Sequence, residues 1–431
     1  MPNENSTAPS DSRRDFLKKS AAISGAAAVG SLSVAQSAHA AGSDMLKVAL
    51  IGCGGRGSGA AKNATMGDEN LKVTVLCDIF PDVLAQARER LGRALGERMD
   101  VTDDSCFSGF DGYKQVMECD VDVVLLATPP HFRPAHLRAA IEAGKHVFCE
   151  KPVAVDGPGC RHVLETVEMA KEKNLSIVSG LCWRYAPMVK ETVAKIKSGA
   201  IGDIVAIHET YLTGTLWYRQ PQPDWTEMEN QVRNWTYYTW LAGDIIAEQH
   251  IHSLDKALWL NDDAPPLVCE AIGGRQVRTE AKWGNIYDNF GVAYAFPNDV
   301  KVFSYCRQMA GCYNDVNDYV LGAKGKAAIL SGTVTPNEGE AWKYDGPGGN
   351  MYDLEHKALY EGIRSGNVIN NGVYMTRSTL MAIMGRMAAY TGQKITWEMA
   401  LNSQEDMTPK KYEWGDVAIP SVAMPGKTKF V

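Results

Sequence analysis

Short apolar runs alternate with amphipathic segments over the first part of the chain. The runs are apolar at nearly every position, which is typical of strands buried on both faces of a parallel sheet. They cover residues 45–51, 72–77, 122–127, 145–149 and 175–180, and helical spacing between them is clearest at residues 136–143 and 157–173. This rhythm predicts a doubly wound parallel sheet of the Rossmann kind over residues 45–182.

The pattern changes after residue 187. A helix over about residues 189–198 is followed by strand-like stretches without helical crossovers between the later ones, which predicts a mainly antiparallel sheet with one open face. The stretches cover residues 204–213, 268–272, 287–296 and 300–305, with a hairpin turn at 322–326 and late helices at 354–364 and 375–391. We therefore expect an α/β chain with a second domain, for substrate and oligomerisation, over residues 183–403, and a tail over residues 404–431.

The first predicted strand runs directly into a glycine-rich turn with the spacing G-x-G-x-x-G. The first glycine would allow the tight turn, the second would let a pyrophosphate approach the backbone, and the third would let the next helix pack on the strand. The candidate cofactor-binding residues of this turn are Gly52, Gly54, Gly55, Arg56 and Gly57. A helix that starts near Ser58 would present free N–H groups and its dipole to the phosphates.

Two further strand ends extend the predicted dinucleotide site. Asp78 ends the second strand, where an acidic side chain would accept hydrogen bonds from a ribose diol and repel a 2′-phosphate. NAD is therefore expected in preference to NADP, although a helix cap or a turn would also explain Asp78. The loop after residues 122–127 contributes Thr128, Pro129 and His131, which we expect over the nicotinamide ribose.

A third strand end carries a lysine. The run at residues 145–149 delivers Glu150, Lys151 and Pro152 to the carboxyl end of the sheet, where open α/β sheets bind ligands. Pro152 biases Lys151 toward an extended backbone and ends the strand, so the ammonium group would project from a fixed point beside the cofactor. Glu150 and Lys151 are both assigned to the predicted cofactor site. A surface lysine at a strand end is the alternative.

The stretch from residue 240 to residue 255 carries the candidate proton acceptor. If it is helical from Asp244 onward, Glu248 and His252 stand at i and i+4 on one face. A carboxylate beside an imidazole fixes its tautomer and raises its basicity, which suits a general base near neutral pH. His252 would accept a hydroxyl proton while Lys151 stabilises the developing alkoxide. The alternative is a solvated Glu/His pair on an amphipathic helix.

Aromatic rings and guanidinium groups near these stretches are candidates for substrate contact. Rings could stack on a sugar, and arginines could bind its hydroxyls or a carboxylate. The candidates are Arg184, Tyr185, Arg233, Trp235 and Trp240. Core packing or a subunit interface would also explain the rings. Several of them belong to residues 214–240, an insertion rich in Trp and Tyr.

The composition narrows the class of ligand. The 431 residues hold 44 Lys and Arg against 51 Asp and Glu, a formal charge of -7, so neither nucleic acid nor an anionic membrane is an expected partner. The hydrophobic share of 45% is enough for a large globular core. Histidines and cysteines show no metal-ligand spacing, so no metal site is predicted. A small-molecule substrate is the expected partner.

The first forty residues are typical of an export signal. Arg13 and Arg14 precede a weakly hydrophobic Ala/Gly/Ser stretch, and Ala38-His39-Ala40 offers small side chains to a signal peptidase. We expect a twin-arginine signal over residues 1–40 and a periplasmic or otherwise exported mature protein. The alternatives are an uncut, lipid-facing anchor and a chance arginine pair in a disordered tail.

Together, the leader, the glycine turn, Glu150-Lys151-Pro152 and the stretch from Gly243 to Asp255 resemble the Gfo/Idh/MocA oxidoreductase family. The resemblance implies a Rossmann domain, a C-terminal α/β domain with an open-faced sheet, bound NAD(P), and a homodimer or homotetramer formed through that sheet. It also implies catalytic roles for Lys151 and His252, with Glu248 as the acid before the histidine. The family typically has Asp there and often Gly next, so Glu248 suggests a shifted substrate position.

These features predict an NAD-dependent oxidoreductase acting on a secondary hydroxyl of a sugar, cyclitol or sugar derivative. One alternative is a redox-neutral, NAD-dependent glycosidase, whose characteristic Tyr-Pro-Thr-His-Gly run is not seen in this sequence. Another is a non-catalytic sugar or nucleotide sensor, although a sensor needs no proton acceptor. Because an exported enzyme meets little free NAD, we expect tight retention of the cofactor and a second substrate that reoxidises it in place.

Overall fold

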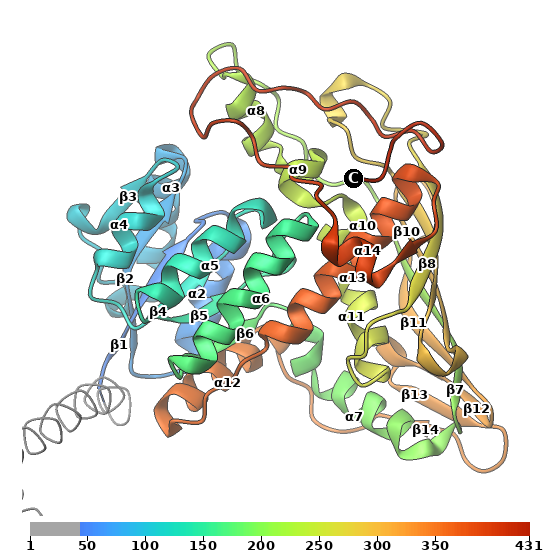
Figure 1. Cartoon of the computed structure of the whole chain (residues 1–431). Helices are drawn as coiled ribbons and strands as arrows, with labels where there is room; N and C mark the ends of the chain where they lie inside the picture. Colours follow the sequence, from blue (N-terminus) through green and yellow to red (C-terminus); the bar gives the residue numbers. More distant parts are fainter. Residues whose placement is uncertain (1–43) are drawn as a thin grey trace, which may run out of the picture.

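A computed structural model describes residues 44–431 as two sheets, each packed with helices (Figure 1). The predicted export signal lies outside the described residues. Among residues 44–431, no helix is both long and apolar enough to cross a bilayer. The six-stranded sheet comes first in the chain and the nine-stranded sheet second.

The first sheet holds six parallel strands in the order β3-β2-β1-β4-β5-β6. The strands are β1 (Leu46–Ile51), β2 (Leu71–Asp78), β3 (Cys106–Ser108), β4 (Val123–Leu126), β5 (His146–Cys149) and β6 (Ile177–Ser179). The helices around them are α2 (Gly55–Gly67), α3 (Pro81–Leu95), α4 (Gly112–Glu118), α5 (Arg133–Glu142) and α6 (Gly157–Glu172). All four side chains of β4 are buried, as its continuous apolar run predicted. The strand order is that of a dinucleotide-binding Rossmann sheet, which confirms the doubly wound fold.

The second sheet has nine strands in the order β14-β13-β12-β11-β7-β10-β9-β8-β15. The strands are β7 (Ile204–Thr213), β8 (Val268–Gly274), β9 (Asn289–Ala295), β10 (Lys301–Gln308), β11 (Asp315–Gly322), β12 (Gly325–Ala328), β13 (Thr333–Pro336), β14 (Trp342–Lys343) and β15 (Ile395–Thr396). The β7 and β10 strands are parallel, and the other neighbours are antiparallel. The prediction of a mainly antiparallel sheet is therefore confirmed.

Eight helices of the described residues follow the first domain in the chain. They are α7 (Pro187–Lys195), α8 (Glu227–Arg233), α9 (Thr239–Ala242), α10 (Ile245–Glu248), α11 (Ile251–Leu260), α12 (Met351–Ser365), α13 (Gly372–Thr391) and α14 (Trp397–Asn402). The α11 and α13 helices lie on the side of the second sheet that faces the first domain (Figure 1). The α13 helix is buried on all sides along most of its length, so it forms the centre of the molecule.

The outer face of the second sheet is apolar in part. Side chains alternate between buried and exposed along β10, which leaves Phe303 and Tyr305 exposed at 41% and 42%. Val205 on β7, Leu321 on β11 and Ile272 on β8 are exposed as well. One face of the sheet therefore packs on the core while the other shows large hydrophobic side chains.

The α12 helix does not belong in space to the domain in which the sequence places it. It packs along α2 of the first domain (Figure 1), where Leu359, Tyr360 and Ile363 complete the core beside β1 and β2. Gly67 permits this approach, because a Cβ there would lie 2.8 Å from the backbone nitrogen of Lys357. The domain boundary expected at residue 182 thus omits a helix that returns about 170 residues later.

The predicted helix from Asp244 to Asp255 is wrong as a continuous element. It is broken into α10 and α11 at Gln249 and His250. The side chain of Gln249 accepts a hydrogen bond from Gln308 at 2.7 Å, and His250 Nε2 is bonded to Ser304 Oγ. Because both partners lie on β10, contacts with the sheet replace the helical path that the sequence pattern indicated.

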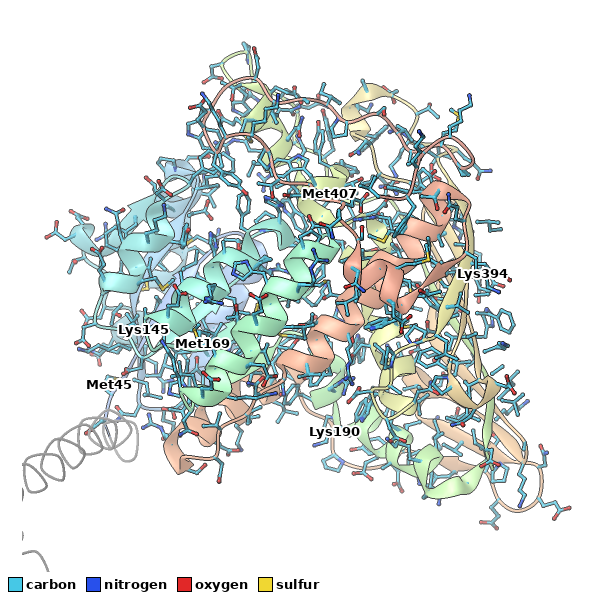
Figure 2. The ribbon with its side chains drawn as sticks, viewed as in Figure 1. Met45, Lys145, Met169, Lys190, Lys394 and Met407 are labelled. Atoms are coloured by element: carbon cyan, nitrogen blue, oxygen red, sulfur yellow. The ribbon has the colours of Figure 1, made fainter. Side chains whose placement is uncertain are left out.

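The tail after α14 contains neither helix nor strand, as expected from its lack of periodicity. Its two ends meet, because Ser403 Oγ donates to the main-chain oxygen of Val431 at 2.7 Å and the Gln404 amide donates to the same atom. Met407 packs from the tail against the core of the second domain (Figure 2). The tail is therefore a closed loop laid over the body of the molecule.

Candidate active site

A cavity of about 490 Å³ lies at the carboxyl ends of β1, β2 and β4. The glycine turn, Asp78, Thr128 and Pro129 line one side of it. This position is where doubly wound sheets bind dinucleotides, and the volume falls in the range of cofactor pockets.

The glycine turn has the space that a pyrophosphate needs. A Cβ on Gly57 would lie 1.8 Å from the main-chain oxygen of Gly52, so this glycine is required for α2 to pack on β1. A Cβ on Gly54 or Gly55 would meet nothing within 4 Å, so the backbone is open toward the cavity. The first N–H groups of α2 would face a bound anion at this point. These residues fit a bound dinucleotide.

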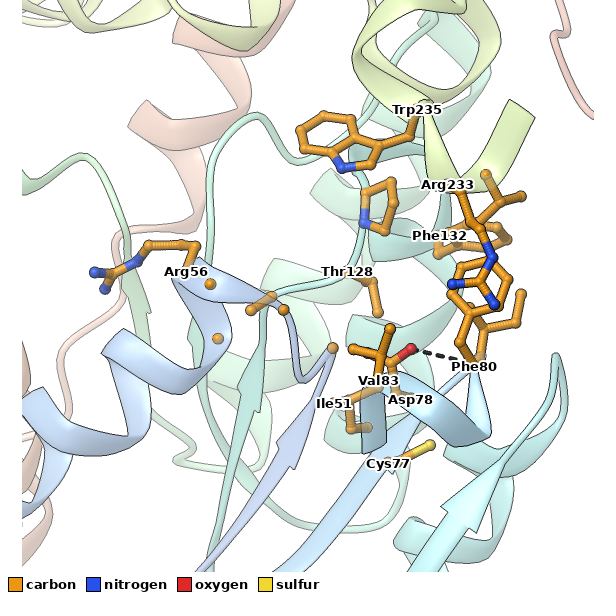
Figure 3. Close-up of a pocket in the computed structure, with 18 of the residues that line it drawn as sticks. Ile51, Arg56, Cys77, Asp78, Phe80, Val83, Thr128, Phe132, Arg233 and Trp235 are labelled. Carbon is orange, nitrogen blue, oxygen red and sulfur yellow. Dashed lines mark hydrogen bonds between the residues drawn. The ribbon is translucent and has the colours of Figure 1, made fainter. Parts of the chain in front are cut away.

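Asp78 stands at the end of β2 in the position of a ribose-binding carboxylate. Its Oδ2 accepts a hydrogen bond from the Cys53 amide at 2.6 Å, and its Oδ1 accepts one from the Phe80 amide at 2.9 Å (Figure 3). Burial raises the pKa of Asp78, and the two amide bonds oppose that shift. Each oxygen keeps a further lone pair, so the side chain can still accept from a ribose diol.

Arg56 and Glu150, both predicted in the cofactor site, are bonded to each other. The guanidinium group of Arg56 donates to Glu150 Oε1, lies 3.6 Å from Glu355 Oε1, and stacks 4.6 Å from the ring centre of Tyr352. It points away from Asp78 (Figure 3). Burial and the neighbouring Glu150 raise the pKa of Glu355 well above its usual value. Because Glu355 and Tyr352 come from α12, sequence reasoning did not find this group.

Lys151 is tied to the segment that carries the histidine. Its Nζ donates to the main-chain oxygen of Glu248 at the end of α10. The Lys151–Pro152 peptide bond is cis. Glu248 also lines the dinucleotide cavity, so this bond joins the strand end of the first domain to the second domain beside that cavity.

His252 lies in the first turn of α11, four residues beyond Glu248. Burial, and next the charge of Lys151, lower its pKa well below the usual value, so the imidazole is neutral at neutral pH. The expected pairing of Glu248 with His252 is not formed: Glu248 Oε2 and His252 Nδ1 are both buried without a hydrogen-bond partner. The break after α10 explains the difference, because the two residues do not share one helix.

The remaining loop residues of the predicted cofactor site have separate partners. Thr128 Oγ1 lies 3.4 Å from His136 Nδ1, and Pro129 lines the cavity. His131 is bonded through Nε2 to the hydroxyl of Tyr412 at 2.8 Å. Burial lowers the pKa of His131 to about 4, so this ring is neutral and its contact is with the tail.

Three of the five substrate candidates lie outside the lining of the dinucleotide cavity and are held by internal hydrogen bonds. Arg184 donates to both carboxylate oxygens of Asp255 and to Asp263. The Tyr185 hydroxyl donates to Asn371 at 2.8 Å, and Trp240 Nε1 donates to Gln231 at 2.7 Å. These bonds indicate structural roles for the three side chains.

The other two candidates, Arg233 and Trp235, line the dinucleotide cavity opposite Asp78 (Figure 3). They follow one another closely at the end of α8 and just after it, and Trp217 and Arg219 of the same insertion join them. The sequence drew attention to this segment through its content of Trp and Tyr but did not show its position. The structure places it over the cofactor cleft.

A buried charged cluster lies beneath α11. Lys256 Nζ pairs with Asp318 Oδ2 at 3.0 Å and donates to the main-chain oxygen of His252 at 2.6 Å. Glu209 is fully buried nearby, and burial and the charge of Asp318 raise its pKa. Among residues 44–431, no group of three or more His, Cys, Asp or Glu is placed to hold a metal ion. The sequence pattern gave no signal for this cluster, since its members are far apart in the chain.

Residues 46–180 match the family model described as GFO_IDH_MocA, an oxidoreductase family with an NAD-binding Rossmann fold. Levoglucosan dehydrogenase of Pseudarthrobacter phenanthrenivorans is 29% identical over 189 residues, 43% of this chain and 42% of that protein. Inositol 2-dehydrogenase of Acidothermus cellulolyticus is 28% identical over 222 residues, 51% of this chain and 58% of that protein.

The likeness to solved structures covers more of the chain. A levoglucosan dehydrogenase in complex with NADH and levoglucosan superposes with a TM-score of 0.64 at 20% identity, covering 82% of this chain and 99% of that one. An aldose-aldose oxidoreductase from Caulobacter crescentus, complexed with glycerol, gives a TM-score of 0.63 at 19% identity over 82% of this chain and 99% of that one. These superpositions show a common fold. Residues 46–180 thus match the NAD-binding Rossmann domain of the Gfo/Idh/MocA oxidoreductase family in sequence.

Proposed function

We propose that this protein oxidises a secondary hydroxyl of a sugar, cyclitol or sugar derivative to a ketone, or runs the reverse reaction, with NAD as cofactor. The observation that carries the proposal is the hydrogen bond from Lys151 to Glu248, which lines the dinucleotide cavity four residues before the buried, neutral His252. The names of the inositol and levoglucosan dehydrogenases support the substrate class.

The residues divide the chemistry between them. The glycine turn and Asp78 would hold NAD, which supplies the hydride acceptor when bound. His252 is neutral, so an unprotonated ring nitrogen can take the hydroxyl proton. Lys151 can donate a hydrogen bond to the same oxygen and stabilise it as negative charge develops. Burial around His252 excludes water from this step.

The test compares Lys151→Ala with the wild type on a panel of polyols. We expect a loss of at least about a hundredfold in kcat, because one proton-handling or oxyanion-stabilising group contributes that much or more. NAD content is measured in both proteins, so that a loss of cofactor is distinguished from a loss of chemistry. Lys171→Ala is the matched control, an exposed lysine of α6 paired only with Glu168.

Two outcomes would contradict the proposal. The assigned chemistry would be excluded if the wild type oxidised none of the polyols in the panel. It would also be excluded if the wild type and Lys151→Ala turned over a polyol equally fast. Release of an aglycone from a glycoside without net NADH would assign the site to redox-neutral glycoside cleavage.

We also propose that two copies pair through the outer face of the second sheet. Phe303 and Tyr305 on β10 and Leu321 on β11 are large apolar side chains exposed on the two strands that flank β7. Exposed apolar patches of this kind mark protein interfaces. A second copy is the expected partner, because the same patch on both subunits can form an isologous dimer.

A further inference from the structure

The dinucleotide cleft has a second wall that lies outside the Rossmann domain. Trp217, Arg219 and Arg233 line the same cavity as the glycine turn and Asp78. Arg233 reaches across the cleft and donates to both carboxylate oxygens of Asp82, at 2.9 and 3.2 Å. The insertion of residues 214–240 is therefore bonded to the first turn of α3, beside the end of β2.

Phe80 is the point at which this wall meets the Rossmann domain. The centre of the Phe80 ring lies 3.9 Å from the guanidinium carbon of Arg233. Phe80 itself lines the cavity. Arg233 is held in this position from its own helix, because its Nε donates to Glu229 at 2.9 Å. The Arg233 side chain is mostly buried in this position, with 11% of its surface exposed.

The tail makes a second set of contacts at the same place. Trp414 stacks on Phe80 with ring centres 5.4 Å apart and packs against Phe110 at 4.8 Å. Tyr412 is bonded to His131 at 2.8 Å. Phe80 and Phe110 both line the cavity, so the tail forms the outer layer of its wall.

The tail and α8 are also bonded to each other. The Met228 amide donates to the main-chain oxygen of Gly415 at 3.0 Å, and Gln231 Nε2 donates to that of Ala418. A second cavity, of about 720 Å³, separates part of the tail from α9 and α13. Around this cavity the tail still contacts the domain, because Val417 and Ala423 pack against its core and the Tyr287 hydroxyl donates to the main-chain oxygen of Ala423 at 2.9 Å. At the cleft itself, the contacts of Tyr412 and Trp414 hold the tail in place.

We infer that α8 and residues 410–414, together called the cover, close the dinucleotide cleft and make release of NAD slow. Three links hold the cover on the Rossmann domain: the pair of Arg233 with Asp82, the bond of Tyr412 to His131 and the stack of Trp414 on Phe80. NAD leaves only when these links open, so the cofactor stays bound over many turnovers. The inference rests on NAD as cofactor and extends the proposed function.

The experiment measures release of NAD, not turnover. Wild type and the double variant Tyr412→Phe, Trp414→Ala are saturated with NAD, passed through gel filtration, and mixed with excess isotopically labelled NAD. Mass spectrometry of the denatured protein then follows the exchange. We expect one NAD retained per wild-type chain and exchange at least about tenfold faster in the variant, since it loses a hydrogen bond and an aromatic stack.

Tyr344→Phe, Trp342→Ala is the matched control. Tyr344 donates to Pro347, and its ring lies 6.4 Å from that of Trp342, at the far end of the second sheet. This variant should exchange NAD as the wild type does. Tyr412→Phe alone removes one hydroxyl and serves if the double variant does not fold; a faster exchange in it alone supports the same inference.

Complete exchange by the wild type within seconds, or equal rates in wild type and both tail variants, would overturn the inference. The result is separable from that of the proposed function. If NAD is retained but no polyol is oxidised, the proposed function is wrong and the inference about the cover stands. If polyols are oxidised but NAD exchanges freely, the inference about the cover is wrong and the proposed function stands.

Discussion

Lys256 carries a positive charge into the interior, directly beneath the helix that holds His252. It is 1% exposed, and its partner Asp318 is fully buried. A buried pair of this kind contributes little to stability as a whole, but loss of one partner leaves an uncompensated charge. Here Glu209 is a second buried carboxyl group beside the pair; burial and the charge of Asp318 raise its pKa, and the charge of Lys256 opposes that shift.

We expect Lys256→Met to lower the free energy of unfolding by about 3 to 5 kcal/mol. Lys197→Met is the control, because its pair with Asp262 lies at the surface, with side chains 35% and 83% exposed. That change should cost less than about 1 kcal/mol. Denaturant unfolding measures both, and equal losses would show that Asp318 and Glu209 do not need the lysine.

Single residues also show where reasoning from the sequence ends. Asp78 could be predicted because its place is set by a local pattern, a strand that follows a glycine turn at a known distance. Arg184 could not be assigned correctly from the sequence, since Asp255 and Asp263, which bind it, lie about 70 to 80 residues later. The sequence alone does not show which residue a charged side chain will pair with in the folded protein.

At the scale of elements, the glycine turn allows a test that separates fold from binding. We expect Gly54→Ala to leave the melting temperature of the cofactor-free protein nearly unchanged, because its Cβ meets no protein atom within 4 Å and the backbone φ of -62° suits alanine. The affinity for NAD should fall at least about tenfold, because the methyl group occupies the space of the pyrophosphate.

Gly92→Ala is the control for this change. Gly92 lies within α3, where a Cβ also meets nothing within 4 Å, so the alanine should raise helix stability slightly and leave NAD binding unchanged. Calorimetric titration of the cofactor-free proteins with NAD gives both affinities. Normal binding by Gly54→Ala would place the pyrophosphate away from this turn.

The elements themselves could be predicted wherever burial alone determined them. Continuous apolar runs gave β1, β2, β4 and β5 within about two residues, because strands buried on both faces need little other information. The break between α10 and α11 could not be predicted, because helical spacing continues through Gln249 and His250. Their side-chain bonds to β10 are tertiary contacts that local patterns do not contain.

For the whole molecule, pairing through the outer face of the second sheet makes a testable prediction. We expect Phe303→Glu to shift the mass measured by light scattering toward that of a single chain, because a charge on each side would be buried in the interface. Met66→Glu is the control, since Met66 is 72% exposed on α2 of the first domain. A single-chain mass for the wild type would exclude the pairing.

The closure of the cofactor cleft is a property of the whole molecule as well. Its walls come from the Rossmann sheet, the insertion of residues 214–240 and the tail, three segments that are not continuous in the sequence. Composition marked the insertion as aromatic but could not say which surface the rings cover. Only the folded arrangement brings Arg233 to Asp82 and Trp414 to Phe80.

The return of α12 to the first domain limits how the protein can be divided or recombined. A fragment that stops after β6 would leave Ala60 and Ala64 of α2 without the side chains of Leu359 and Ile363 that shield them. A graft of the nucleotide-binding half onto another protein therefore needs two separate stretches of chain. Recombination that keeps the nucleotide-binding half intact must preserve both of these stretches. The two parts of the gene are therefore expected to evolve together and not as interchangeable modules.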